Sequence, residues 1–285
     1  MTQATSLASN FECRISCDIS ADVPSERKSW RAFVGISSLL FAISGALTIA
    51  WCTSMSAMRG MPMPGGWTMS MMWMRMPGHT WGEATASFLA MWVAMMAAMM
   101  LPSQVLVLWR YRQAVRWRRE SRLGSLTLLA GLGYFFVWAL FGLAVFPLGA
   151  ALAAVEMEHP ALARAVPVTA GAVIVIAGAL QFTSWKTHHL ARCRETPAGG
   201  GIIPANARTA WREGMQFGFR CSLSCANLTA ILLVIGVMDL RAMSLVTAAI
   251  TAERLTPAGQ RVAQVTGAVV VVTGLLLITR VIAFR

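Results

Sequence analysis

Charged residues are scarce in this sequence. Lys, Arg, Asp and Glu make up only 13% of its 285 residues, whereas apolar residues make up 56%. A soluble globular domain usually has about a quarter of its residues charged. The chain therefore lacks the polar side chains needed for a large water-facing surface, which argues against a soluble protein and favours lipid as its solvent.

Motifs of the common enzyme classes are also absent. The sequence has no G-x-S-x-G, no H-E-x-x-H, no Walker loop, no dinucleotide fingerprint and no paired carboxylates. We therefore expect no enzymatic activity. Residues 1–29 are polar without a hydrophobic core, so we expect no secretory signal peptide there. The six Cys residues are accordingly not expected to form a disulfide scaffold.

Six apolar runs are long enough to form membrane-spanning helices, which need about 20 mainly apolar residues. These runs cover residues 32–51, 85–108, 124–148, 166–184, 215–237 and 263–282. A seventh segment, 241–253, is short, and even when extended to 240–255 it would span only about 24 Å. It is either a tight crossing or a re-entrant piece buried against its neighbours, and the side of the C-terminus depends on which.

The sequence thus predicts an all-α fold, a polytopic transmembrane helix bundle with six or seven spans. We expect residues 1–31 to form a polar, disordered tail and residues 32–285 to form a single transmembrane domain. We expect the lipid bilayer to be the partner that all the spans contact.

Basic residues are concentrated in alternate connections between the spans. They occur within 27–31, 110–122 and 186–212, and they account for most of the net charge of +12. Positively charged loops stay in the cytoplasm. We therefore predict a cytoplasmic N-terminus and external segments 52–84 and 149–165. Because the charges form short tracts between apolar runs, we do not expect nucleic-acid binding.

Methionine is concentrated in one part of the chain, since 14 of the 19 Met residues lie between Met55 and Met100. Nine belong to the external loop 52–84, in which Gly and Pro around Met61 and Met63 predict a loop or an interfacial hairpin. Thioethers are soft, neutral donors that suit Cu(I). Met residues in a water-exposed segment gain nothing from packing. We therefore interpret the loop as a site that captures Cu(I).

The second span carries five further methionines in the run MWVAMMAAMMLPS. They are Met91, Met95, Met96, Met99 and Met100. At helical spacing they form two neighbouring stripes, which could hold or relay the ion. The alternative is that Met fills gaps between helices while the intervening Ala residues allow close approach. At the outer mouth of this span, His79 and Glu83 could join the loop as harder ligands.

Two groups of donors lie near the predicted cytoplasmic face. Cys221 and Cys225 are four residues apart in RCSLSCAN and share a helix face, as one soft ion would require. His188, His189 and Cys193 close the fourth span in WKTHHLARCR. Together these residues would supply N and S ligands for Cu(I) or Zn(II). The alternatives are small buried thiols and a solvated basic helix end.

Ionisable residues at membrane depth call for a functional hypothesis. Asp239 and Arg241 flank the short segment at one end, and Glu253 and Arg254 flank it at the other. We expect each pair to neutralise itself, which is a structural role.

Several of these motifs, in order, resemble a known family. They lie in residues 61–78, 91–103, 181–194 and 214–259. These segments are similar to the bacterial family of predicted metal-binding integral membrane proteins, also called domain of unknown function 2182. The resemblance extends over about residues 35–280. It implies a polytopic protein of the bacterial inner membrane with a metal site and no agreed reaction.

The resemblance also has implications for individual residues. The family's Met-rich second span corresponds to the five methionines from Met91 to Met100, and its Cys cluster corresponds in position to Cys221 and Cys225. Many members have a further Cys where this chain has Ser224. That difference removes one soft ligand.

We hypothesise from these patterns that the protein handles Cu(I), by binding it, by sensing its supply at the membrane, or by delivering it to a membrane or periplasmic partner. The loop would capture the ion and the Cys pair, with His188, His189 and Cys193, would form the inner site. One alternative is an assembly subunit of a larger complex that needs no metal. Another is a secondary transporter, which the scarcity of acidic residues within the spans disfavours.

Overall fold

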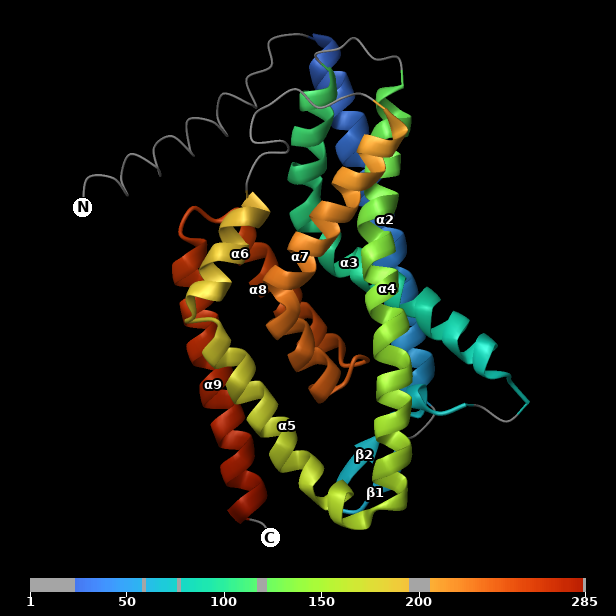
Figure 1. Cartoon of the computed structure of the whole chain (residues 1–285), viewed down its shortest axis with the longest axis vertical. Coiled ribbons are helices and arrows are strands. Elements are labelled where there is room, and N and C mark those ends of the chain that lie inside the picture. Colours follow the sequence, from blue (N-terminus) through green and yellow to red (C-terminus); the bar gives the residue numbers. More distant parts are fainter. Residues whose placement is uncertain (1–23, 58–59, 76–77, 117–121, 195–205, 284–285) are drawn as a thin grey trace, which may run out of the picture.

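The computed structural model describes residues 24–57, 60–75, 78–116, 122–194 and 206–283. Within these ranges the chain forms eight α-helices, a small antiparallel hairpin and one 3-10 turn (Figure 1). The helices are α2 (Pro24–Ala57), α3 (Trp81–Arg116), α4 (Leu123–Glu158), α5 (Pro160–Leu180), α6 (Ser184–Arg194), α7 (Ala207–Ile235), α8 (Leu240–Leu255) and α9 (Gly259–Ala283). The hairpin consists of β1 (Met61–Met63) and β2 (Trp67–Met69), and the turn is η1 (Met71–Trp73). The expected all-α class is confirmed.

The predicted N-terminal tail lies mostly outside the described residues. Residues 24–31, which we also expected in the tail, instead form the first turns of α2. The apolar run that follows them extends the helix without a break, because no Gly-Pro pair or other breaker separates the two.

Six of the helices are long and apolar enough to cross a membrane. They are α2, α3, α4, α5, α7 and α9, and each contains all or most of one of the runs recognised in the sequence. Large apolar side chains on these helices point outward: Leu39, Leu148 and Val265 are each more than 60% exposed. Exposed apolar surface on this scale marks the face that a lipid bilayer would cover. The structure is a polytopic helix bundle.

The seventh segment forms α8, a helix of 16 residues. One face of it, formed by Met243, Val246 and Ile250, is buried, and it packs against α3, α7 and α9. Asp239 caps its start by accepting hydrogen bonds from the backbone N–H groups of Arg241 and Ala242 at 2.8 and 3.0 Å. With 16 residues, α8 falls short of the roughly 20 that a span needs.

The position of α8 decides where the chain ends. Since α8 runs back along the bundle, α9 descends after it and ends near the β1–β2 hairpin, opposite the start of α2 (Figure 1). We call the end at which α2 and α7 begin the basic end, and the end that carries the hairpin the loop end.

Close contacts between α4 and α7 depend on glycine. A Cβ atom on Gly214 would overlap the carbonyl group of Ala130, and one on Gly218 would lie 2.8 Å from the carbonyl oxygen of Tyr134. Small residues at such positions let helix backbones approach closely. This approach sets the register of α7 against α4 and so places Cys221 beside Tyr134.

The substitution Gly214→Ala is expected to destabilise the bundle by about 1–3 kcal/mol, because the added methyl group overpacks a backbone contact. Gly131→Ala on α4 is the matched control, since a Cβ there meets no atom within 4 Å. The control should be neutral or more stable by up to about 1 kcal/mol, from helix propensity. Thermal unfolding of the detergent-solubilised variants measures both, and equal midpoints would contradict the packing argument.

Candidate metal centre

The methionines of α3 are all interior residues. None of Met91, Met95, Met96, Met99 and Met100 is more than 6% exposed. Pro102 lies inside the same helix, and α3 bends between its teal first half and its green second half (Figure 1). Proline removes a helical hydrogen bond and kinks the chain. Because all five methionine side chains are buried, the stripe faces the core of the bundle.

Met100 meets Cys221 of α7 at the end of this stripe. The Cys221 Sγ atom lies 3.8 Å from Met100 Sδ and 2.9 Å from the Tyr134 hydroxyl oxygen. All three side chains are at most 2% exposed. Residues 121 positions apart thus bring a thiol and a thioether into contact in the centre of the bundle.

Cys225 follows one helical turn after Cys221. Its thiol donates a hydrogen bond to the Cys221 carbonyl oxygen at 2.9 Å, and its exposed fraction is 1%. The predicted face shared by the two cysteines is therefore turned into the core. We refer to Met100, Cys221 and Cys225 as the thiol–thioether cluster.

A buried guanidinium group lies against this cluster. Arg254, at the end of α8, donates from Nη2 to Cys221 Sγ at 2.9 Å and to the Cys221 carbonyl oxygen at 3.2 Å. Its Nη1 atom donates to Ser103 Oγ at 3.2 Å. A buried charge is costly unless it is paired. The thiolate form of Cys221 would supply the anion that this guanidinium needs.

Lys186 and Glu253 form a second buried pair near the cluster. Lys186 Nζ lies 2.7 Å from Glu253 Oε2, and both side chains are at most 2% exposed. Lys186 also donates to the carbonyl oxygen of Ser224 at 2.7 Å, and Gln181 donates to Glu253 Oε1 at 2.9 Å. This network fixes α5, α6 and α8 against the part of α7 that carries the cysteines.

These contacts correct one expectation. Glu253 and Arg254 do not neutralise each other, because Glu253 pairs with Lys186 and Arg254 with Cys221. Neighbouring residues on a helix point in different directions and do not face one another. At the other end of α8, Asp239 acts as a helix cap for the backbone.

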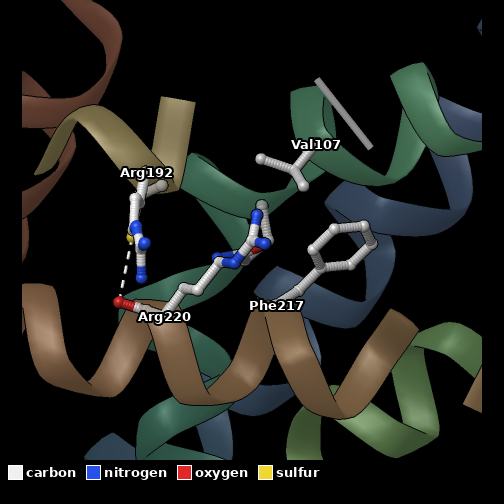
Figure 2. Close-up of a pocket in the computed structure, with 6 residues that line it drawn as sticks. Val107, Arg192, Phe217 and Arg220 are labelled. Carbon is white, nitrogen blue, oxygen red and sulfur yellow. Dashed lines mark hydrogen bonds between the residues drawn. The ribbon is translucent and has the colours of Figure 1, made fainter. Parts of the chain in front are cut away.

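Cys193 lies beside the cluster, in the last turn of α6. Its thiol donates to the carbonyl oxygen of Arg220 at 3.0 Å, one residue before Cys221 (Figure 2). A small pocket opens there, in which Arg192 lies across from Val107 and Phe217 (Figure 2). Cys193 is half-buried, so it is placed between the interior cluster and the surface.

The two histidines remain near the surface of α6. His188 is exposed, and His189 is half-buried with its ring 4.6 Å from that of Trp185. Partial burial, together with His188 and Arg192, lowers the pKa of His189 and so favours its neutral form. Among the described residues no group of three or more His, Cys, Asp and Glu side chains could hold a metal. The structure therefore does not gather the histidines and the cysteines into one site.

Most of the described loop methionines lie in two places, the β1–β2 hairpin and the segment that begins with η1. Met61 and Met63 belong to the hairpin, in which they pair with Met69 and Trp67. Met63 and Met69 pack against Ala153 and Ala163, where α4 meets α5, and Trp67 Nε1 donates to the Ala163 carbonyl oxygen at 2.9 Å. The premise that these methionines gain nothing from packing is therefore wrong for Met63 and Met69, because the hairpin folds onto the bundle.

The contacts of several residues with the two cysteines could not have been predicted from the sequence. Tyr134 and Arg254 bond Cys221, and Lys186 bonds the backbone between the two cysteines. Near the loop end a second thiol–thioether contact joins Cys52 Sγ to Met238 Sδ at 3.7 Å. The predicted membrane depth of Glu253 and Arg254 was one signal, whereas Lys186 lies among the basic residues of a predicted cytoplasmic connection.

The fold and the site together define a class of protein, a multi-span helical bundle with sulfur donors gathered in its interior. The family model of PpoB2, described as a copper chaperone, matches residues 89–277. The chain therefore belongs to this copper-chaperone family. Comparisons with curated proteins and with solved structures give no match.

The matched region contains the whole thiol–thioether cluster together with Tyr134, Lys186, Glu253 and Arg254. It begins at residue 89, later than the resemblance at about residue 35, and leaves residues 61–78 outside. The match supports the metal-related part of that resemblance, and the description of the matched family names copper.

Breaking the buried ion pair should destabilise the fold strongly. Glu253→Gln leaves the Lys186 ammonium buried without its anion, which is expected to cost about 3–5 kcal/mol. The double variant Lys186→Met/Glu253→Gln should recover most of this loss, because no uncompensated charge remains. Glu158→Gln, at an exposed carboxylate of α4, is the control and should change stability by less than about 0.5 kcal/mol. Chemical unfolding in detergent measures all three.

Proposed function

We propose that this protein binds Cu(I) at the thiol–thioether cluster and passes it to a protein partner. The observation that carries the proposal is the buried contact between Cys221 Sγ and Met100 Sδ at 3.8 Å. Thiolate and thioether sulfurs are soft ligands that select Cu(I) over hard divalent ions. Membership in a copper-chaperone family supports the same metal.

The sulfur separation suits a shared ion. Metal–sulfur bonds of about 2.3 Å, as found at zinc sites, allow two sulfurs up to about 4.6 Å apart to bind one ion. At 3.8 Å, Cys221 and Met100 fall within this limit and would bind the ion in a bent arrangement. Cys225, on the same face of α7, would be the third donor after its thiol leaves the Cys221 carbonyl oxygen.

Cys193 provides a route from the cluster to the surface. Its thiol donates a hydrogen bond to the backbone carbonyl oxygen of Arg220, the residue before Cys221. Cys193 also lines the small pocket next to Arg192 and Phe217. A half-buried thiol between an interior site and the surface could accept Cu(I) by ligand exchange. His188 and His189, one turn earlier on α6, would then serve as donors at the point of transfer.

Copper binding is expected to depend on Cys221 and Met100. In detergent under anaerobic conditions with a reductant, Cys221→Ser and Met100→Leu should each weaken Cu(I) binding by more than about tenfold. Loss of an outer-shell partner alone typically costs 10–100-fold. Met157→Leu, at an exposed methionine of α4, should leave the affinity unchanged. Competition against a chromophoric Cu(I) chelator gives the affinities, and equal values for the cluster variants and this control would refute the proposal.

We further propose that the basic end faces the cytoplasm of a bacterial inner membrane, as the distribution of Lys and Arg predicts. Because α9 ends at the loop end (Figure 1), the C-terminus would then be periplasmic. A green fluorescent protein fused to the N-terminus of the full chain should fluoresce, whereas the same protein fused to the C-terminus should not. Alkaline phosphatase at the C-terminus should be active. The opposite pattern would reverse the orientation.

A further inference from the structure

A second concentration of sulfur surrounds a cavity near the loop end, remote from the thiol–thioether cluster. The cavity has a volume of about 310 Å³. Six methionines line it: Met55, Met71, Met72, Met74, Met91 and Met238. They come from α2, from η1 and the residue after it, from α3, and from the turn before α8. Segments far apart in the sequence therefore direct their thioethers to one space.

Filling of gaps accounts for only part of this arrangement, because Met72 and Met91 belong to the buried core but a large space remains beside them. Protein interiors are close-packed and contain few voids larger than a water molecule. One water occupies about 30 Å³ in the liquid, so the cavity has room for several. Flexible methionine side chains normally close such gaps. Here they surround an open space instead.

The mouth of the cavity is polar. His79 and Glu83 line it, and the His79 Nδ1 atom lies 3.6 Å from Glu83 Oε2. Both side chains are about 60% exposed, at 61% and 60%. The carboxylate accepts a hydrogen bond from the Thr80 backbone N–H at 2.7 Å, which holds it at the start of α3. A cation that arrives from solvent would thus meet an imidazole and a carboxylate before the thioethers.

The thiol of Cys52 contacts one of the residues that line the cavity. Cys52 is 2% exposed, and its Sγ atom lies 3.7 Å from Sδ of the lining residue Met238. This contact has the same composition and almost the same length as the Cys221–Met100 contact of 3.8 Å. The bundle therefore contains two thiol–thioether contacts, one beside the cavity near the loop end and one in the thiol–thioether cluster.

We propose that the methionine-lined cavity is a second binding site for a soft monovalent cation, Cu(I) or its analogue Ag(I), distinct from the thiol–thioether cluster. Neutral thioethers suit such an ion, and His79 and Glu83 assist its arrival. The site does not depend on whether copper binds at Cys221. Most of the residues that line the cavity also precede residue 89, so they lie outside the region that the family model matches.

The two sites are linked along α3. Met91 lines the cavity and Met100 belongs to the cluster. The two residues are nine positions apart, which corresponds to about 14 Å along a helix. Met95 and Met99 lie between at intervals of about one turn, and both are buried. An ion released from the cavity would meet thioethers at steps of about 6 Å on its way to Cys221.

Stoichiometry of bound Ag(I), measured by mass spectrometry on the purified full chain in detergent, tests the proposal. The wild type should retain two ions and Cys221→Ser one. Met71→Leu/Met74→Leu should retain one, and the same pair in the Cys221→Ser background should retain none. The control is Met157→Leu, which alters an exposed methionine of α4 that does not line the cavity. This control should retain two.

The outcomes separate the two sites. If Met71→Leu/Met74→Leu retains as many ions as the Met157→Leu control, the cavity is not a metal site. If Cys221→Ser loses nothing while the cavity variant loses its ion, the cluster proposal fails and the cavity proposal stands. Met→Leu conserves side-chain volume, and circular dichroism checks the fold. Should the first pair misfold, Met55→Leu/Met238→Leu removes two lining thioethers from other segments and must show the same loss.

Discussion

Two buried cations constrain the arrangement of this bundle. Lys186 and Arg254 lie within a helical core where water does not compensate their charge, so each must find a partner inside the protein. Lys186 forms an ion pair with Glu253, and Arg254 donates a hydrogen bond to the sulfur of Cys221. These contacts tie α6 and α8 to the cysteine-bearing turns of α7. The cluster is therefore held in place by charge compensation, with the close α4–α7 approach at Gly218 supplying Tyr134.

The same charges bear on how firmly copper would be held. With Glu253 matched to Lys186, a Cys221 thiolate would match Arg254 and leave the interior neutral. A bound Cu(I) then adds one positive charge beside a fixed guanidinium. Like charges at short range in a medium of low dielectric repel each other. A site built in this way binds through soft sulfur and yet favours release, which suits transfer of the ion to a partner.

The sequence was informative where a single segment carries the signal. The six spans follow from apolar length, and the burial of Met91 to Met100 agrees with a functional stripe as well as with helix packing. Cys221 and Cys225 both lie on a buried face of α7, as their spacing of four predicted. The partners of Glu253 and Arg254 could not be predicted, because Lys186 and Cys221 come from other helices. Met238 was overlooked for the same reason, as its neighbour Cys52 is 186 residues away.

The distribution of donor types along the bundle suggests an order of events. At the loop end the sulfur atoms that line the cavity are thioethers, which are neutral and would bind an ion without losing a proton. At the other site a thioether is joined by two thiols, and one of these thiols accepts a hydrogen bond from a buried guanidinium. A thiolate binds a soft cation more strongly than a thioether because of its charge. The gradient in ligand strength therefore runs from the cavity toward the cluster, and Met95 and Met99 lie along it on the buried face of α3.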